Sequence, residues 1–247
     1  MMTARPSRDR PAAKPAAPAK PTPAQSTPAR AAGPGRPKDL GKRAAILEAA
    51  KRMFTRLGFD GASMDQIAAE AGVSKLTVYS HFGDKETLFG AAVKSHCETG
   101  LPPSLFEARP DIPLRERLLA VARAFYGMIT SPEAIAGHRM LCTPQLAGTP
   151  LSRLFWEAGP DRVQNAFATL LERRIASGEL DIEPRPEAIH RAATQFCVLL
   201  KGEPHAMLVF GCGDVDPADT EAHLAASVDM FLRAYATGRQ PRRAPSR

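Results

Sequence analysis

The apolar positions after residue 40 recur at the spacing of an α-helix. They follow the pattern i, i+3, i+4, i+7, i+8 and i+11, in Ile46, Ala49, Ala50, Met53, Phe54 and Leu57. This spacing places all of these side chains on one helix face, so it predicts a helix that ends at Gly58.

Three further helices are predicted from their capping residues. Ser63 and Gln66 form a capping-box pattern at the start of a second helix, which ends before Gly72. Ser74 caps a third helix that reaches His81, and Asp84 caps a fourth. The side chains predicted to face inward from the second and fourth helices are Ile67, Ala68, Leu88, Phe89 and Ala92.

The helical period continues through the rest of the chain. One stripe consists of Leu114, Leu118, Val121, Ala122, Phe125 and Ile129. A helix restarts at Ser131-Pro132, with proline in its first position, and another spans roughly residues 161–177 and stops at Gly178.

Two long apolar helices are predicted at residues 186–210 and 217–236. We expect Pro204 to kink or interrupt the first of them. One face of the second carries Leu224, Val228, Phe231, Leu232 and Tyr235. No segment has a convincing strand pattern, so the sequence predicts an all-α protein built as a helical bundle.

Residues 63–81 have the features of a helix-turn-helix. Ala68 is small where the two helices meet, Gly72 suits a turn with positive φ, and Val73 and Val78 supply inner contacts. The outer residues include hydroxyl, phenol and ammonium groups, which bond phosphate oxygens, and residues near a helix start can reach base edges. This pattern predicts a DNA-binding module.

Positive charge is concentrated at the chain ends. Residues 1–38 contain eight Lys and Arg residues against one acid, Asp9, together with many prolines and alanines. We expect this segment to be a disordered basic tail that favours a nucleic-acid partner. Arg36, between Gly35 and Pro37, is predicted to enter a DNA minor groove, and a solvated linker arginine is the alternative.

The remaining composition limits the class of protein. No apolar run is long enough to span a membrane, and the scattered residues Cys97, Cys142, Cys197 and Cys212 suit a reducing compartment, so a cytoplasmic protein is expected. The sequence has no nucleophile elbow, phosphate-binding loop or zinc-protease motif, and its histidines form no local metal pair. We therefore expect no enzyme activity, no metal and no cofactor.

The segment "AAILEAAKRMFTRLGFDGASMDQIAAEAGVSKLTVYSHFGDKETLFGAAV", residues 44–93, resembles the N-terminal DNA-binding domain of TetR-family transcriptional regulators. The likeness includes "IA-x-x-AGVS", "T-V-Y-x-HF" and "K-x-x-LF". Further on, "FWEAGPDRVQNAFATLLERRIASGEL" and "LLKG" resemble the ligand-binding domain of the AefR-like branch. The resemblance implies a ligand-responsive regulator, most often a repressor that binds a palindromic operator as a homodimer.

The resemblance also implies roles for individual residues. Lys75, Leu76 and Tyr79 would face base edges, and Thr77, Tyr79 and His81 would touch phosphates. Ser63 and Lys85 would hold the DNA backbone at two helix starts. Leu76 can offer only an apolar contact, for example to a thymine methyl group. Tyr79 and Phe82 have an alternative role in the core or hinge, and His81 could be a helix C-cap.

The expected domain order is a tail at residues 1–38, a DNA-binding domain at 39–90, a ligand-binding and dimerisation domain at 91–238, and a basic tail at 239–247. By resemblance, the two closing helices pair with their copies. Candidate pocket residues, each with core packing as the alternative, are Phe125, Met128, His138, Met140, Phe155, Trp156, Gln195, Phe196 and Met207.

Two other regulatory functions stay open at this point. A redox regulator on the same scaffold would use Cys142 or Cys197 as its sensing thiol, and Arg139 lies three residues before Cys142. An architectural DNA-binding protein would bind through its basic tail without sequence preference.

Overall fold

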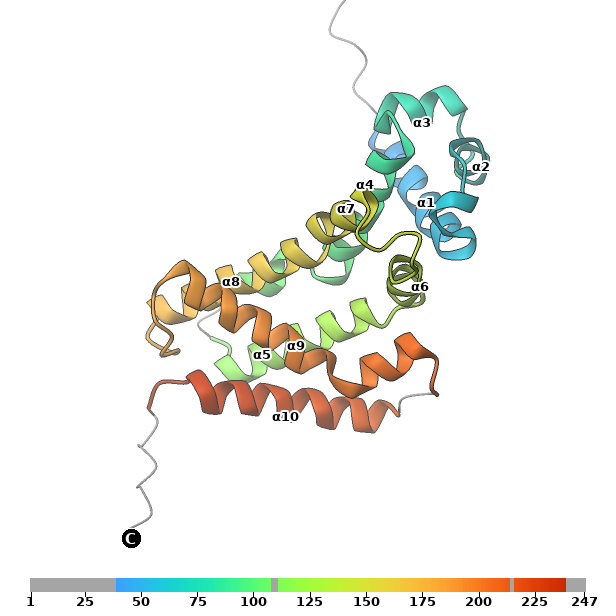
Figure 1. Ribbon diagram of the computed structural model, residues 1–247. Helices are drawn as coiled ribbons and strands as arrows, with labels where there is room; N and C mark the ends of the chain where they lie inside the picture. Colours follow the sequence, from blue (N-terminus) through green and yellow to red (C-terminus); the bar gives the residue numbers. More distant parts are fainter. Residues whose placement is uncertain (1–38, 108–110, 214–215, 239–247) are drawn as a thin grey trace, which may run out of the picture. The chain divides into compact units, whose positions relative to one another are not determined.

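A computed structural model of the chain describes residues 39–107, 111–213 and 216–238. Within these ranges it contains ten α-helices, one 3₁₀ helix and no β-strand, which confirms the predicted all-α class (Figure 1). The tails at residues 1–38 and 239–247, including Arg36, lie outside the described residues. Over the same ranges, no helix is both long enough and apolar enough to cross a membrane.

The first four helices are present as predicted. They are α1 (Leu40–Gly61), α2 (Met64–Glu70), α3 (Lys75–Phe82) and α4 (Lys85–Gly100). The predicted capping box at the start of α2 is formed, because Ser63 accepts from the Gln66 N–H and the Gln66 side chain accepts from the Ser63 N–H. Gly72 has φ 65°, which confirms the positive-φ turn between α2 and α3.

The end of α1 differs from the prediction. The helix is broken at Gly58, where φ is 71°, and then continues for a short turn to Gly61. Beyond this break Phe59 turns inward and packs between Phe54 and Phe89, with ring centroids 5.9 and 5.5 Å away. Leu57, predicted to face inward, is instead exposed.

The remaining helices are η1 (Pro103–Phe106), α5 (Leu114–Ile129), α6 (Pro132–Leu141), α7 (Pro150–Ala158), α8 (Pro160–Ala176), α9 (Pro186–Phe210) and α10 (Pro217–Tyr235). Sequence periodicity did not predict η1 or α7. The start of α7 nevertheless carries a readable signal, because Thr149 caps it and Pro150 occupies its first turn, as Ser131 and Pro132 do in α6.

The expected interruption of α9 occurs at Gly202 and not at Pro204. Pro204 has no N–H to donate to the Leu200 carbonyl, and its ring crowds that turn of helix. The backbone opens earlier because Gly202 can adopt φ 51°. Side chains of α10 donate to the carbonyl groups that the break leaves without a helical partner. His223 Nε2 lies 3.2 Å from the Leu200 oxygen, and Ser227 Oγ lies 3.2 Å from the Leu199 oxygen.

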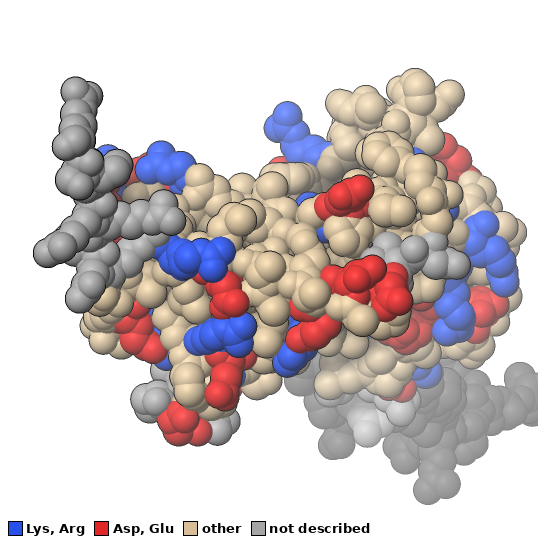
Figure 2. Space-filling model, turned by 90° about the horizontal axis from the view of Figure 1, so that it is seen from below, with Lys and Arg blue, Asp and Glu red and all other residues tan. Residues whose placement is uncertain are grey.

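Two hydrophobic clusters hold the helices together. One joins α1–α4 with Leu151 of α7, and the other joins η1, α5, α8, α9 and α10 around Phe167, Phe196 and Phe231. Ion pairs Arg115–Asp229 and Arg123–Glu221 tie α5 to α10. On the face that carries α10, charged groups of both signs lie among uncharged side chains (Figure 2).

Helix α4 belongs to both parts of the molecule. Leu88 and Phe89 lie in the first cluster, whereas His96 Nε2, farther along the helix, is 3.1 Å from the Met128 carbonyl oxygen of α5. The expected domain boundary at residue 90 therefore falls inside a continuous helix. Helix α4 thus connects the first three helices to the C-terminal helices.

Candidate functional site

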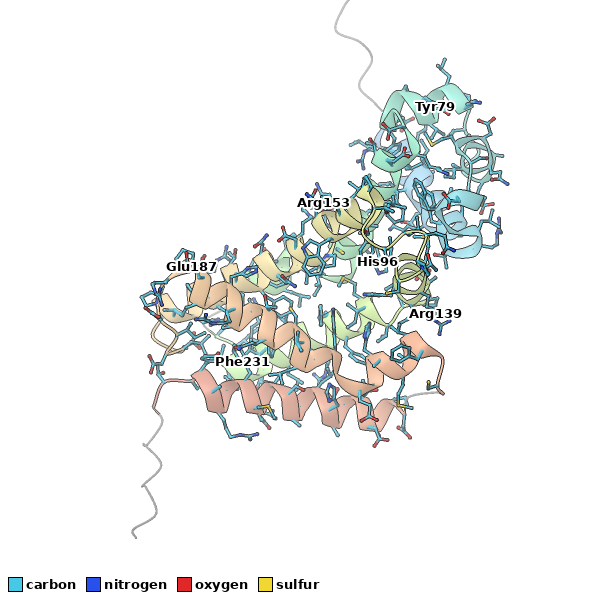
Figure 3. All side chains as sticks on the ribbon, in the orientation of Figure 1. Tyr79, His96, Arg139, Arg153, Glu187 and Phe231 are labelled. Carbon is cyan, nitrogen blue, oxygen red and sulfur yellow. The ribbon has the colours of Figure 1, made fainter. Side chains whose placement is uncertain are left out.

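Helix α3 has one buried and one exposed side. Val78 is fully buried and Phe82 is 5% exposed, so the core alternative considered for Phe82 is correct. Leu76 is 78% exposed and Tyr79 41% exposed, and Tyr79 lies on the outer side of α3 (Figure 3). A short helix with two large exposed side chains has the geometry needed to enter a DNA major groove.

Lys75 is positioned by a neighbouring acid. Its Nζ lies 2.8 Å from Asp65 in the first turn of α2 and 5.9 Å from the centre of the Tyr79 ring. The hydrogen bond and charge of Asp65 raise the pKa of Lys75. These contacts link the start of α3 to α2 and hold the ammonium beside Tyr79.

Two of the predicted phosphate contacts take part in helix caps, since Ser63 caps α2 and Thr77 bonds Ser74, the residue that caps α3. Ser63 Oγ lies 3.2 Å from the Gln66 N–H, and the Ser74 and Thr77 hydroxyl oxygens are 2.8 Å apart at the start of α3. Capping fixes where each helix begins. It also leaves the first backbone N–H groups of α2 and α3 as the anion-binding groups at these ends.

Lys85 opens α4, as predicted, and its side chain turns back to the end of α1. Its ammonium donates to the carbonyl oxygens of Phe59 at 2.8 Å and Ala62 at 3.1 Å, and it lies 4.3 Å from the Phe59 ring centre. Since the ammonium is directed into the end of α1, it does not face a DNA backbone in this conformation. At the start of α4, the groups that could donate to a phosphate are backbone N–H groups and not the Lys85 ammonium.

His81 is partly buried. Its Nδ1 is buried and has no hydrogen-bond partner among the described residues. The imidazole centre lies 6.1 Å from the Phe82 ring. At the C-cap, Gly83 has φ 78° and its N–H donates to the Tyr79 carbonyl, so the glycine ends the helix and the C-cap alternative for His81 is wrong.

A second feature is a cavity of about 120 Å³ next to the first hydrophobic cluster. Its wall is mainly apolar and draws side chains from α1 and α4–α9. Of the nine predicted pocket residues, the structure brings together five: Phe125, Met128, His138, Met140 and Phe155. The contributions of α1 and α4, such as Phe54 and Phe89, escaped prediction because core periodicity alone cannot distinguish a packed face from a cavity wall.

The other four predicted pocket residues do not line this cavity. Trp156 is exposed on α7, and Phe196 packs in the core against Phe167 and Phe231. Gln195 accepts a hydrogen bond from the Tyr235 hydroxyl at 2.8 Å. Met207 follows the break in α9 and is only partly buried there.

His138 lines the cavity and packs against a second histidine, His205, behind it in the fold. The rings of His138, which lines the cavity, and His205 are 5.2 Å apart. Burial lowers the pKa of His138, and burial, His138 and Lys201 lower the pKa of His205 to about 4. His138 Nδ1 lies 3.0 Å from the Ala134 carbonyl, so Nδ1 carries the proton.

Burial keeps the two cavity thiols protonated. It raises the pKa of Cys97 to about 11 and that of Cys197 to about 12. A thiol in this state is a poor nucleophile, which argues against Cys197 as a peroxide-sensing residue. Cys142, the other candidate, is exposed.

The cavity touches the first helices through Met140. This side chain lines the cavity, and its sulfur accepts the Phe59 N–H at 3.2 Å, at the break in α1. Lys51, Phe54 and Thr55 of α1 also line the cavity. The cavity is therefore bordered by α1, the helix that supports α2 and α3.

Two family models match the chain. Residues 46–92 match the bacterial regulatory proteins of the tetR family, and residues 116–237 match the C-terminal domain of AefR-like transcriptional repressors. The second match runs from the first turn of α5 to the end of α10, and α5–α9 supply most of the cavity wall.

Individual proteins show the same similarity. The chain is 26% identical over 155 residues to the transcriptional repressor AcnR of Corynebacterium glutamicum, covering 62% of this chain and 76% of AcnR. A crystal structure of a TetR-family regulator from Mesorhizobium loti is 30% identical with TM-score 0.66, covering 82% of this chain and all of that one.

The structure of the flavonoid-responsive regulator FrrA is also 30% identical, with TM-score 0.62, and covers 81% of this chain and all of that one. The DNA-binding module and the C-terminal helices of this chain thus both have counterparts in solved structures of transcriptional regulators. The chain belongs to the TetR family of transcriptional regulators, with an AefR-like repressor domain as its C-terminal part.

Proposed function

We propose that this protein is a homodimeric repressor that binds a palindromic operator through α3 of each protomer and is released by a small effector. The observation that carries the proposal is the cavity, because its wall includes both α1 of the DNA-binding part and helices of the C-terminal domain. An effector there would contact both parts at once.

The proposed dimer uses α9 and α10. Val198 is 62% exposed and Phe210 78% exposed on α9, and Met230 is exposed on α10. Large apolar side chains on exposed helix faces are suited to an interface with a second copy. Two-fold symmetry would present two α3 helices to half-sites about 34–36 Å apart.

The proposed response to an effector is a population shift. The Phe59 N–H at the break in α1 is bonded by Met140, and Lys85 of α4 bonds the carbonyl oxygens on either side of the same turn. A ligand that displaces Met140 would favour a second arrangement of α1 relative to α4. It would lower DNA affinity by its differential affinity for the two arrangements.

One relative supports control by a small molecule. FrrA is described as flavonoid-responsive, and it shares the fold over nearly its whole length with this chain. The effector class of this protein depends on the residues that line its own cavity.

Selection of bound sequences from a random duplex library tests the proposal. Wild type should enrich a palindrome at physiological salt, and Tyr79→Ala should enrich it weakly or not at all. Tyr235→Phe is the matched control, since this tyrosine lies on α10 and bonds Gln195. If wild type binds duplex without enriching any sequence, the architectural function replaces the proposed one.

A further inference from the structure

Lys201 is a cation without a partner at the cavity wall. It lies on α9 directly before the break at Gly202, is partly buried and lines the cavity. Among the described residues it has no hydrogen bond or ion pair. Lys51, the other lysine of the wall, differs because its Nζ is 2.7 Å from Glu48.

The acid of the cavity wall, Glu133, forms no ion pair with Lys201. Glu133 borders both the cavity and an outer groove, together with Lys51, His96 and Met128. Lys201 borders the cavity but not the groove. Glu133 is exposed and forms no ion pair with Lys201, so it does not neutralise the ammonium through a direct contact.

The neighbouring histidines give a second indication of uncompensated positive charge. Burial is the main cause that lowers the pKa of His138 and of His205. The positive charge of Lys201 is a smaller cause that lowers both pKa values further. Burial keeps Cys197, one turn before Lys201, protonated, so its thiol supplies no negative charge. Among the described residues, neither Glu133 of α6 nor Glu203 of α9 forms an ion pair with Lys201.

The rest of the wall is mainly apolar, and the volume of the cavity is close to that of one aromatic ring. The cavity measures about 120 Å³ and is bordered by Phe54, Phe89, Phe125 and Phe155. An apolar cavity of roughly 150 Å³ can accept benzene. Small movements of the flexible side chains of Met128 and Met140 would provide the remaining space.

We propose that the cavity binds a ring-sized apolar ligand that carries one carboxylate, with Lys201 as the counter-charge. This inference rests on the proposed function, in that it names the effector class of the same cavity. With its carboxylate at Lys201 on α9, such a ligand would place its ring among the aromatic side chains and against Met140. It would thereby connect α9 to the contact between Met140 and Phe59.

Three probes of one shape and different charge test the proposal: benzoate, benzamide and benzamidine. Isothermal titration calorimetry of the full chain at pH 7.5 would measure each affinity, for wild type, Lys201→Met, Lys201→Arg and Lys94→Met. Lys94 is the control because it is an exposed lysine on α4, 3.7 Å from Glu98. Circular dichroism would check that each variant is folded.

Wild type and Lys94→Met should bind benzoate about tenfold or more tightly than benzamide, with benzamidine weakest. Lys201→Met should abolish the preference, and Lys201→Arg should retain a large part of it. Equal affinities for the three probes in wild type, an unchanged preference in Lys201→Met, or no binding of any probe at millimolar concentration would each overturn the proposal.

Failure of this inference and failure of the proposed function can be told apart. Operator selection needs no ligand, so an enriched palindrome with no charge preference in the cavity contradicts only the ligand class. Lys201-dependent benzoate binding without any operator contradicts only the regulatory function.

Discussion

At the scale of single residues, two lysines in the DNA-binding part have different partners and different expected roles. Lys75 is exposed and paired with an exposed acid, whereas Lys85 bonds two backbone carbonyls at the end of α1 and lies against the Phe59 ring. Exposed ion pairs contribute little to stability, but a partly buried ammonium that satisfies backbone acceptors contributes more. We therefore expect Lys75 to contribute to DNA binding and Lys85 to contribute to the stability of the fold.

Lys85→Met should lower the free energy of unfolding by about 1–3 kcal/mol, because the two carbonyls lose their donor. Lys75→Met should change it by less than about 0.5 kcal/mol while weakening operator binding. Urea denaturation of both variants and of Lys94→Met measures the difference. Equal stability of the two variants would contradict the structural role of Lys85.

His205 makes stability depend on pH in the acid range. Burial, His138 and Lys201 lower its pKa from the ordinary 6.5 to about 4, so the folded state favours the neutral ring. The unfolded chain therefore binds a proton that the folded chain refuses between these two pH values. This contribution is present in full above about pH 6.5 and is lost as pH falls toward about 4.

His205→Gln should reduce the loss of stability between pH 7 and 4 by up to about 3 kcal/mol relative to wild type. Urea denaturation at several pH values gives this comparison, and carboxylates common to both proteins cancel from it. His190→Gln, on the exposed side of α9, is the control. Parallel pH curves for wild type and His205→Gln would contradict the assigned titration.

At the scale of secondary structure, caps and periodic stripes were enough to predict most helices. Ser63, Ser74, Asp84 and Ser131 each cap the helix that the pattern assigned to them. Breaks were harder to place, because they depend on contacts between helices. In α9 the site of the break follows from Gly202 and from the donors that α10 presents, which no local pattern reveals.

The same limit applies to the candidate site. The exposure of Leu76 and Tyr79 follows from helix geometry once Val78 is placed inside. Whether an apolar residue packs or borders a cavity depends on its partners across the fold, so Phe155 and Phe196 could not be distinguished from sequence. The direction of the Lys85 side chain could not be predicted for a related reason, since its carbonyl acceptors lie at the end of α1.

Gly202 should be far less tolerant of substitution than another glycine with positive φ. A Cβ at Gly202 would overlap the His223 ring, whereas a Cβ at Gly178, with φ 76°, meets nothing within 4 Å. Gly178→Ala should cost about 1 kcal/mol of stability from backbone strain, and Gly202→Ala clearly more because overlap is added. Urea denaturation checks this order; a larger loss in Gly178→Ala would contradict it.

At the scale of the whole molecule, we expect DNA binding and dimerisation to use different surfaces, α3 for DNA and α9 with α10 for the second copy. Val198→Glu on α9 should convert the proposed dimer to a monomer and thereby weaken operator binding, because each half-site contact would form alone. Leu76→Glu, on the exposed side of α3, should leave the dimer intact and still abolish operator binding. Sedimentation velocity with anisotropy measures both; a wild type that is monomeric at micromolar concentration would contradict the dimer.

The most direct test of sequence-specific binding by two copies of α3 uses three labelled duplexes of equal length. They are the selected palindrome, the same duplex with one half-site scrambled, and a fully scrambled duplex, titrated with wild type by fluorescence anisotropy at physiological salt. A palindromic operator predicts binding about a thousandfold tighter than to the fully scrambled duplex, with most of this gain lost when one half-site is scrambled. Affinities within about tenfold of one another would contradict it and leave only charge-driven binding.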